Sequence, residues 1–227
     1  MRTIARLLVL GCLVAPRAGG QQHDIQSWTL LTAQVGLADR GRSFLYLEGQ
    51  ARVGDDVSQL ERLLLRPAVG RQLSRDIAVS LGYAWTPTFI DTRYEEAFRG
   101  EHRLWQQLFA RHGTGRLAWQ HRLRQEQRLL DDAGGTSHRT RYLARASYAL
   151  GGQRRRGITG YHELFWTWNS VDRGPQSGFD RSRVFLGPYL VRPGVRYEVG
   201  YVGEYGKRFG PSDRMVHALL LSANLTF

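Results

Sequence analysis

The 227-residue chain is basic, with a formal net charge of +12, and it contains one cysteine, Cys12. Because Cys12 lies in an N-terminal segment that we predict to be removed, the mature chain has no thiol for a disulfide framework, a thiolate metal site or a nucleophile. The mean hydropathy is negative and no run of about twenty apolar residues follows the N-terminal segment, which excludes a bundle of membrane-spanning helices. A β-barrel remains compatible with these values, because only alternate residues of its strands face lipid.

Residues 1–20 have the pattern of a secretory signal peptide. Arg2 and Arg6 precede an apolar run over 7–15, and small residues at 18–20 supply a cleavage site. We therefore predict a signal peptide over 1–20 and a mature domain over 21–227. A lipoprotein cut at Cys12 is the alternative, but that cut would leave a very short apolar run.

The positive charge of the mature chain is almost entirely arginine. Loss of Arg2, Arg6 and Arg17 with the signal peptide lowers the formal net charge from +12 to +9, and Lys207 is the only lysine. A basic chain suggests nucleic acid as a partner, but an exported protein rarely meets any. We expect instead outer-membrane lipid and lipopolysaccharide, whose phosphates arginine binds bidentately. A GC-rich genome that encodes its positive charges as arginine explains the composition equally well.

From residue 27 onward, the chain divides into segments of alternating apolar and polar residues separated by turn residues. This period of two is that of β-strands, and no segment has a convincing helical period. In the second segment, for example, Leu45 and Leu47 would face lipid while Glu48 and Arg52 face inward. The predicted strands are 27–37, 42–53, 60–72, 76–86, 101–111, 116–129, 139–150, 158–169, 182–191, 195–206 and 214–227.

The connections between these segments alternate in length, as do the short periplasmic turns and longer outer loops of outer-membrane barrels. Such bacterial barrels have an even number of strands, so eleven segments suggest that one strand is merged or split. We therefore predict an all-β, antiparallel, up-and-down transmembrane barrel of about twelve strands, within a range of ten to twelve. The short connections are 73–75, 113–115, 151–157 and 192–194, and the longer ones are 87–100, 130–138, 170–181 and 207–213.

The last segment, 214–227, has the clearest membrane pattern. Alternate residues from Met215 to Leu225 form a nearly continuous apolar face, and the other face becomes small and polar toward the end. This alternation is expected of a strand with lipid on one side and the lumen on the other, although the last strand of a soluble β-sandwich is an alternative. We predict that the terminal Phe227 is an assembly signal, with the barrel assembly machinery as its partner.

Tryptophans concentrate near the ends of the predicted strands, at Trp85, Trp105, Trp119, Trp166 and Trp168. Amphipathic rings prefer the boundary between membrane and water, where barrels carry two aromatic girdles. Ordinary packing within a sheet is the alternative for any single ring. Together these residues favour the girdles.

The segment 122–128 has the most distinctive charge pattern, because four charged residues alternate with uncharged ones. An arginine that faces hydrocarbon at the midplane costs about 2–4 kcal/mol, so these side chains must face the lumen. Two interpretations follow: a lumen lined for anions, or a narrow barrel filled by a ladder of Arg–Glu pairs, which we favour. The predicted network consists of Arg122, Arg124, Glu126, Arg128, Arg141, Arg145, Glu48, Glu163 and Glu198.

Histidine and serine are the residues through which this chain could be an enzyme. Lipid-modifying outer-membrane barrels place a serine or histidine with a polar partner on the outer rim. The adjacent pairs Ser137-His138 and His162-Glu163 face opposite sides of a strand, so neither forms a ready dyad. The sequence has no GxSxG elbow and no His-x-His or HExxH spacing for a metal. We therefore predict no enzymatic activity, no catalytic residue, no metal and no cofactor.

Several of these features together resemble one known family. They are the signal peptide, the strand rhythm, the sequence RLRQEQR at 122–128, the sequence RTRYLARASYAL at 139–150 and the terminal aromatic strand. The chain is similar over essentially its whole mature length to the outer-membrane barrels known as domain of unknown function 2490 (DUF2490). This resemblance implies a barrel in the outer membrane, and it carries over no activity and no ligand.

The sequence thus leads to one function and one main alternative. We predict a non-enzymatic, porin-like outer-membrane barrel of a Gram-negative bacterium, either structural or a narrow pore with an Arg/Glu-lined lumen. The alternative is a lipid-modifying enzyme, of the lipid A deacylase or acyltransferase type, that acts at the outer rim. A soluble periplasmic β-sandwich that binds polysaccharide is a third and weaker alternative. The sequence leaves the oligomeric state open.

Overall fold

The computed structural model of the protein is built from β-strands. It describes residues 22–37, 42–92, 95–207 and 213–227, so the predicted signal peptide lies outside the described residues. In this part of the chain, no helix is long and apolar enough to cross a membrane. The strands are β1 (Gln22–Gly36), β2 (Ser43–Gly54), β3 (Gln59–Gln72), β4 (Ile77–Trp85), β5 (Thr88–Thr92), β6 (Glu95–Arg99), β7 (Glu101–Thr114), β8 (Leu117–Leu130), β9 (Thr136–Ala149), β10 (Arg156–Thr167), β11 (Gly178–Arg192), β12 (Val195–Gly206) and β13 (Arg214–Thr226).

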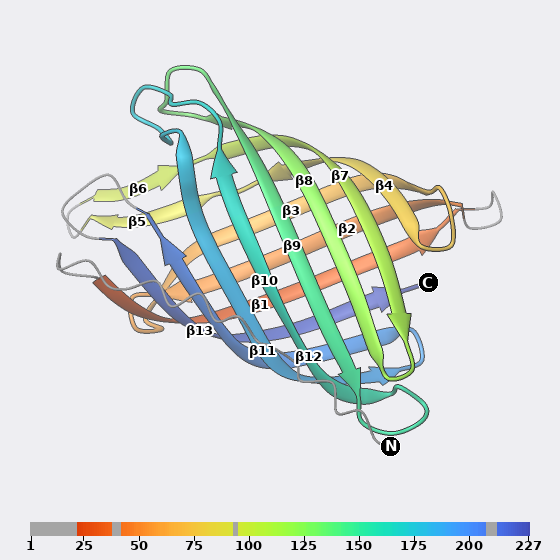
Figure 1. Ribbon diagram of the computed structural model, residues 1–227. Coiled ribbons are helices and arrows are strands. Elements are labelled where there is room, and N and C mark those ends of the chain that lie inside the picture. Colours follow the sequence, from red (N-terminus) through yellow and green to blue (C-terminus); the bar gives the residue numbers. More distant parts are fainter. Residues whose placement is uncertain (1–21, 38–41, 93–94, 208–212) are drawn as a thin grey trace.

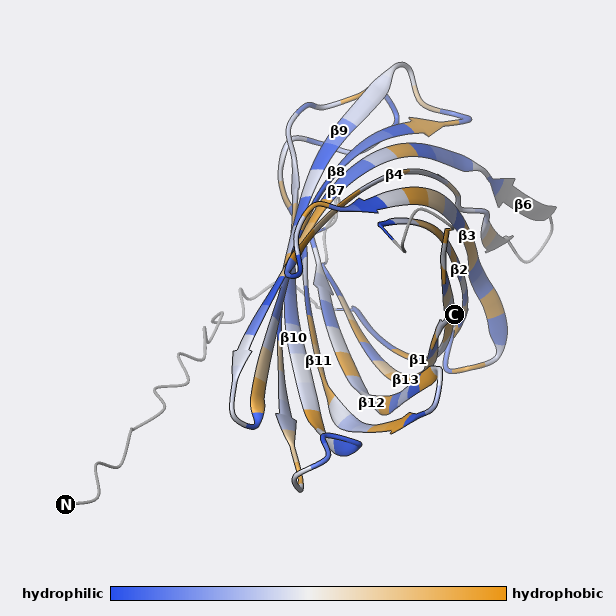
Figure 2. Ribbon diagram, turned by 90° about the vertical axis from the view of Figure 1, so that its right-hand side faces the viewer, coloured by the Kyte–Doolittle hydropathy of each residue, from blue (hydrophilic) through white to orange (hydrophobic). Residues whose placement is uncertain are grey.

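Eleven of these strands form one closed barrel (Figures 1 and 2). Consecutive strands pair antiparallel within the two series β1–β4 and β7–β13, and β4 pairs antiparallel with β7. The barrel closes between β1 and β13, which run parallel from Gln22↔Arg214 to Gln34↔Thr226. The predicted all-β barrel of ten to twelve strands is therefore confirmed.

The direction of the closing pair differs from the prediction. The eleven predicted segments each correspond to one of the eleven barrel strands. Successive strands of an up-and-down sheet reverse direction, so an odd number leaves the first and last strands pointing the same way. The closing pair is therefore parallel, although parallel pairing is slightly less stable per residue than antiparallel pairing. The expectation of a wholly antiparallel, even-numbered ring was wrong at this one seam.

The short strands β5 and β6 extend one hairpin of the barrel. The ladder between β4 and β7 ends at Trp85↔His102, and the same register resumes at Thr88↔Arg99 between β5 and β6. Pro87 interrupts the ladder because it has no N–H group, and its carbonyl accepts a hydrogen bond from β3 at 3.1 Å. The loop predicted after β4 is thus partly a strand extension, which brings the total to about twelve strands when β5 and β6 are counted as one addition.

The two faces of the sheet differ in polarity. In β2, Leu45 and Leu47 are 47% and 48% exposed on the outside, whereas Glu48 and Arg52 are each 8% exposed on the inside. Hydrophilic and hydrophobic residues alternate along the strands around the barrel (Figure 2), and the exposed large apolar residues show that the apolar side faces outward. Large exposed apolar residues lie on nearly every barrel strand: Leu31, Leu65, Val69, Leu81, Leu104, Leu123, Leu164, Leu186, Val199 and Leu219.

The tryptophans differ in exposure. Trp85, Trp166 and Trp168 are exposed near strand ends, whereas Trp105 is 1% exposed and points into the barrel, so the girdle prediction is wrong for Trp105. There it packs against Ala68 and Ala84. Trp105 occupies an inward position of its strand, so its ring serves interior packing instead of the membrane boundary. Whether the exposed rings form girdles at a membrane stays a prediction.

The position of the Trp105 ring depends on a glycine in the neighbouring strand. Gly82 pairs with Trp105, and a Cβ atom at Gly82 would overlap the ring. We expect Gly82→Val to lower the free energy of unfolding by about 1–3 kcal/mol, because overpacking displaces the ring. Urea unfolding in detergent micelles measures the effect. Gly49→Val is the matched control, since a Cβ there meets nothing within 4 Å, and equal losses for both variants would contradict this explanation.

Candidate functional site: the charged lumen

Charged side chains line most of the barrel interior. Strand alternation turns every second residue inward, and the sequence places charged residues at many of these positions. Among the described residues, fourteen arginines and nine carboxylates face the lumen or its mouth. The arginines are Arg52, Arg62, Arg66, Arg103, Arg122, Arg124, Arg128, Arg139, Arg141, Arg145, Arg181, Arg183, Arg196 and Arg214, and the carboxylates are Asp24, Glu48, Glu61, Glu101, Glu126, Glu163, Asp180, Glu198 and Glu204.

Eight of these side chains form a closed ring of alternating charge, which we call the charge ring. Each member forms an ion pair with both of its neighbours in the ring, and all eight come from β8 to β12. The ring is neutral because it contains four charges of each sign. In order, it runs through Arg139, Glu126, Arg141, Glu163, Arg183, Glu204, Arg181 and Asp180, and then returns to Arg139.

Two buried glutamates hold the inner part of the charge ring. Glu126 has no exposed surface and accepts from Arg139 at 2.5 Å and from Arg141 at 2.9 Å. Glu163 is 1% exposed and accepts from three arginines, Arg141 at 2.7 Å, Arg122 at 2.6 Å and Arg183 at 3.3 Å. Such multiple charge-assisted bonds offset the cost of desolvating the ions. Loss of either carboxylate would remove one of the two counterions of two buried guanidinium groups, and loss of Glu163 would also leave Arg122 without its ion pair.

Four smaller ion-pair clusters surround the charge ring. They are Glu101 with Arg103 and Arg128, Glu48 with Arg66, Glu198 with Arg145 and Arg196, and Arg214 with Asp24 and Glu61. Even with all these pairs formed, the fourteen arginines exceed the nine carboxylates by five positive charges among the side chains that the structure describes. A guanidinium group does not lose its proton at physiological pH, so this excess is permanent.

Three lumen arginines carry much of the excess: in the described part of the chain, Arg52, Arg62 and Arg124 form no ion pair. The guanidinium groups of Arg52 and Arg124 lie 3.7 and 4.3 Å from the ring centres of Trp28 and Trp105. Cation–π contact stabilises such groups without neutralising them. The two buried tryptophans therefore hold positive charge inside the barrel.

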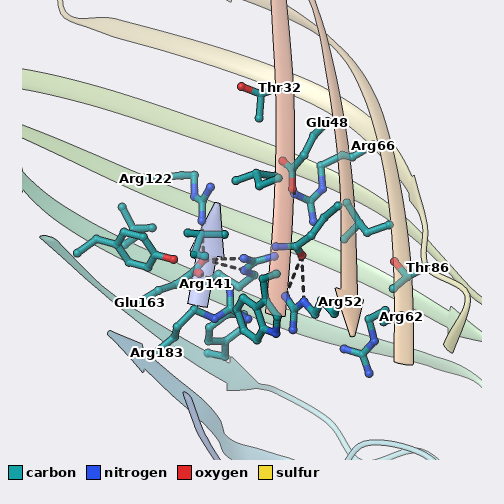
Figure 3. Close-up of a pocket in the computed structure, with 18 of the residues that line it drawn as sticks. Thr32, Glu48, Arg52, Arg62, Arg66, Thr86, Arg122, Arg141, Glu163 and Arg183 are labelled. Atoms are coloured by element: carbon teal, nitrogen blue, oxygen red, sulfur yellow. Dashed lines mark hydrogen bonds and ion pairs between the residues drawn. The ribbon is translucent and has the colours of Figure 1, made fainter. Parts of the chain in front are cut away.

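Some arginine nitrogens in the lumen have unused hydrogen-bonding capacity. Among the described residues, Arg66 Nε, Arg122 Nε and Arg124 Nη1 are buried without a hydrogen-bond partner. An unsatisfied buried donor costs about 1–3 kcal/mol. Arg66 and Arg122 line the main cavity, where they face each other across the lumen near Glu48 (Figure 3). Guanidinium N–H groups beside a cavity are suitable donors to an anion.

The main cavity lies within the lumen and is small. Its volume is about 190 Å³, and residues from β1 to β3 and from β7 to β13 line it. Figure 3 shows Arg52, Arg62, Arg66, Arg122 and Arg183 around it. Pockets for drug-sized ligands measure about 300–1,000 Å³. The space therefore suits water and small ions better than a sugar or a peptide.

The structure places all nine residues of the predicted network on the inward side. It brings Arg122, Glu126, Arg141 and Glu163 into direct contact, while Arg145 and Glu198 form a separate pair at 2.5 Å. Whether these residues act as a functional network stays a prediction. The predicted network omitted charged lumen residues on β3, β7 and β11. Because charged residues recur there at every second or fourth position, the strand alternation could have identified them: Arg62, Arg66, Glu101, Arg103, Arg181 and Arg183.

Several histidines on the outer face pair with hydroxyl groups on adjacent strands. His162 Nε2 lies 2.7 Å from Ser182 Oγ, and His121 Nδ1 lies 2.9 Å from Tyr142 Oη. In the described residues, no carboxylate forms an ion pair with His162, so the His162–Ser182 pair lacks a third group that would orient the imidazole as in a catalytic triad. We interpret these contacts as mutual satisfaction of polar groups on an apolar surface.

The end of the chain packs against the first strand. The Phe227 N–H donates to the Gln34 carbonyl at 2.9 Å, and the Phe227 carbonyl accepts from Gly36 at 3.1 Å. The Phe227 side chain is 71% exposed. Its role as an assembly signal stays a prediction.

The fold and lumen define a class: a small closed β-barrel with an apolar outer surface and an interior filled with ion pairs. Across the described residues, no group of three or more His, Cys, Asp or Glu side chains could hold a metal ion. The chain belongs to the family described as protein of unknown function (DUF2490), whose model matches residues 25–216.

A relative of similar length aligns with nearly the whole chain. The chain is 29% identical over 222 residues to an uncharacterized protein of Methylorubrum extorquens, an alignment that covers 95% of each chain. No solved structure matches the chain. The resemblance to DUF2490 is thus confirmed, and it brings no assigned activity with it.

Proposed function

We propose that this protein is a non-enzymatic barrel of the bacterial outer membrane whose lumen is a narrow, anion-biased passage. The apolar exterior supports the membrane location, because soluble monomers rarely expose contiguous apolar surface of more than a few hundred Å². Here exposed leucines and valines recur on the outward side of nearly every barrel strand. The signal peptide predicted over 1–20 and the exposed tryptophans near strand ends are consistent with export to such a membrane.

The charge of the lumen supports the anion bias. The neutral charge ring lies on the side of the barrel formed by β8 to β12, and two of the three arginines without an ion pair, Arg52 and Arg62, line the main cavity. A permanent excess of five positive charges repels cations and attracts small anions. The observation that carries the proposal is therefore the presence of Arg52, Arg62 and Arg124 inside the barrel without carboxylate partners among the described residues.

We expect the purified barrel to give small, anion-selective conductance in planar bilayers. A charge about 4 Å from an ion changes its energy by about 1 kcal/mol even in water, which is roughly fivefold in a permeability ratio. Arg52→Gln should therefore lower the anion-to-cation permeability ratio by up to about fivefold. The reversal potential in a salt gradient measures this ratio.

Arg173→Gln is the matched control for this measurement. Arg173 lies in an outer connection, with 76% of its side chain exposed, and its loss should leave the ratio unchanged. Folding into membranes is checked first by comparing boiled and unboiled samples on mild-detergent gels. A cation-selective conductance, or inserted barrels that conduct nothing, would contradict the proposed passage.

A further inference from the structure

The connections at one end of the barrel form a continuous circle. Backbone hydrogen bonds link Arg42 to Gln72, Asp76 to Arg111, Arg116 to Ala149, Arg155 to Val191 and Gly194 to Thr226, and Phe227 joins this circle to β1. The short turns and the end of β13 therefore share one end of the barrel (Figure 1). Short turns are periplasmic in bacterial outer-membrane barrels, so this end is the periplasmic one under the proposed function.

This end is strongly basic. Besides Arg111, eight described arginines lie in its turns or at the strand ends beside them, and we call this set the basic rim: Arg42, Arg71, Arg75, Arg116, Arg154, Arg155, Arg156 and Arg192. In the described part of the chain, none of the eight forms an ion pair with a carboxylate; the pair at this end is Arg111 with Asp76, at 3.8 Å. The opposite end differs, because Asp132 and Asp172 there pair with Arg99 and Arg173.

Three arginines of the basic rim continue the outward faces of their strands. Arg71 follows Val69 on β3, and Arg156 and Arg192 occupy the same outward register as Ile158 on β10 and Leu190 on β11. Val69, Ile158 and Leu190 are 56%, 47% and 39% exposed. On each of these three strands, the row of outward apolar residues therefore ends in an arginine, at the level where the hydrocarbon of a membrane would end.

Tyrosines mark the same depth beside the basic rim. Tyr148 pairs with Ile158 and is 48% exposed, and Tyr197 pairs with Leu190 and is 47% exposed. Exposed tyrosines of this kind sit at the headgroup level of a bilayer. The arginines one step beyond them can extend their aliphatic stems along the apolar surface and place their guanidinium groups among the headgroups.

From this arrangement we propose that the basic rim binds the phosphate groups of anionic phospholipids in the periplasmic leaflet. This inference rests on the proposed function, since it needs the barrel to be in a membrane. Guanidinium groups bind phosphate bidentately. Each cationic side chain close to an anionic leaflet raises the association constant with that leaflet by about fivefold. The position of the basic rim around the barrel, at the end of the lipid-facing columns, selects membrane headgroups over a soluble anionic partner.

Native mass spectrometry of the folded full-length mature barrel tests the proposal, with phosphatidylglycerol and phosphatidylcholine added in equal amounts. We expect preferential retention of phosphatidylglycerol. Each arginine is expected to contribute about fivefold to the binding of phosphatidylglycerol. The double variant Arg156→Gln/Arg192→Gln should therefore bind this lipid about 25-fold more weakly. The matched control is Arg99→Gln/Arg173→Gln, which removes two arginines from the opposite end and should leave retention unchanged.

The outcomes separate this inference from the function on which it rests. If the barrel does not insert into vesicles of either lipid, the proposed function fails. If it inserts normally but retains both lipids equally, or if only the control variant loses phosphatidylglycerol, the basic rim proposal fails. A preference of the basic rim for lipid A phosphates over phosphatidylglycerol would also overturn it, because the rim would then face the outer leaflet.

Discussion

Replacing Glu163 with glutamine is expected to lower the free energy of unfolding by about 3–5 kcal/mol. Glu163 is 1% exposed and forms ion pairs with Arg122, Arg141 and Arg183. The amide keeps the shape of the side chain but removes its charge, so the buried guanidinium groups of Arg141 and Arg183 and the partly exposed one of Arg122 lose their shared counterion. Urea unfolding in detergent micelles, followed by tryptophan fluorescence, gives the change directly.

The matched control for Glu163 is an exposed carboxylate with a single partner. Asp172 lies 3.6 Å from Arg173, and both side chains are more than three-quarters exposed. Asp172→Asn should change the free energy of unfolding by no more than about 1 kcal/mol, because water screens a surface pair. If both variants gave the same small change, the charge ring would not stabilise the barrel in the manner described.

An arginine in place of Leu186 should cost about 2–4 kcal/mol if the outer face lies in hydrocarbon. Leu186 lies near the middle of β11, faces outward and is 62% exposed. On a soluble protein, such an exposed position would accept arginine with little effect. Reversible unfolding in lipid vesicles, in which the folded state spans a bilayer, measures the difference.

A second substitution controls for depth in the bilayer. Leu73 is 60% exposed but lies in the turn between β3 and β4, beside the basic rim. Leu73→Arg should cost only about 0–1 kcal/mol, the range found near the membrane interface. Similar small costs at Leu186 and Leu73 would argue against the membrane location and would favour a soluble barrel.

The alternation of residue types was enough to predict the strands and their faces. The pattern of Leu45, Leu47 and Glu48 requires a strand with one apolar side, and the structure has that strand in that orientation. Alternation could not identify the strand extension at β5, because Pro87 interrupts the ladder at its start. The polar start of β1 at Gln22 was also missed, since its residues carry no apolar period.

The contacts in the lumen were much less predictable than its composition. Alternation indicates that Arg139 faces inward, but it cannot place Asp180, which lies at a β-bulge beside the inward-facing Arg181. The 2.9 Å contact between Arg139 and Asp180 joins β9 to β11 across the intervening strand. Such a contact depends on the curvature of the closed sheet and on the stagger of its strands. The prediction for Trp105 was wrong because it rested on the nearness of this residue to a strand end. Whether position 105 faces inward or outward depends instead on the alternation along its strand.

The parallel seam between β1 and β13 has a topological consequence for assembly. In an even-numbered barrel, both ends of the chain remain on the side of the membrane from which the chain arrived. With eleven strands, Gln22 and Phe227 lie at opposite ends of the barrel. In the proposed orientation, the polar beginning of β1, with His23 and Asp24, has to be carried across the hydrocarbon before the seam can close. Under the proposed function, membrane insertion would therefore include the translocation of the segment that begins β1, a step that hairpin-by-hairpin insertion of an even barrel does not require.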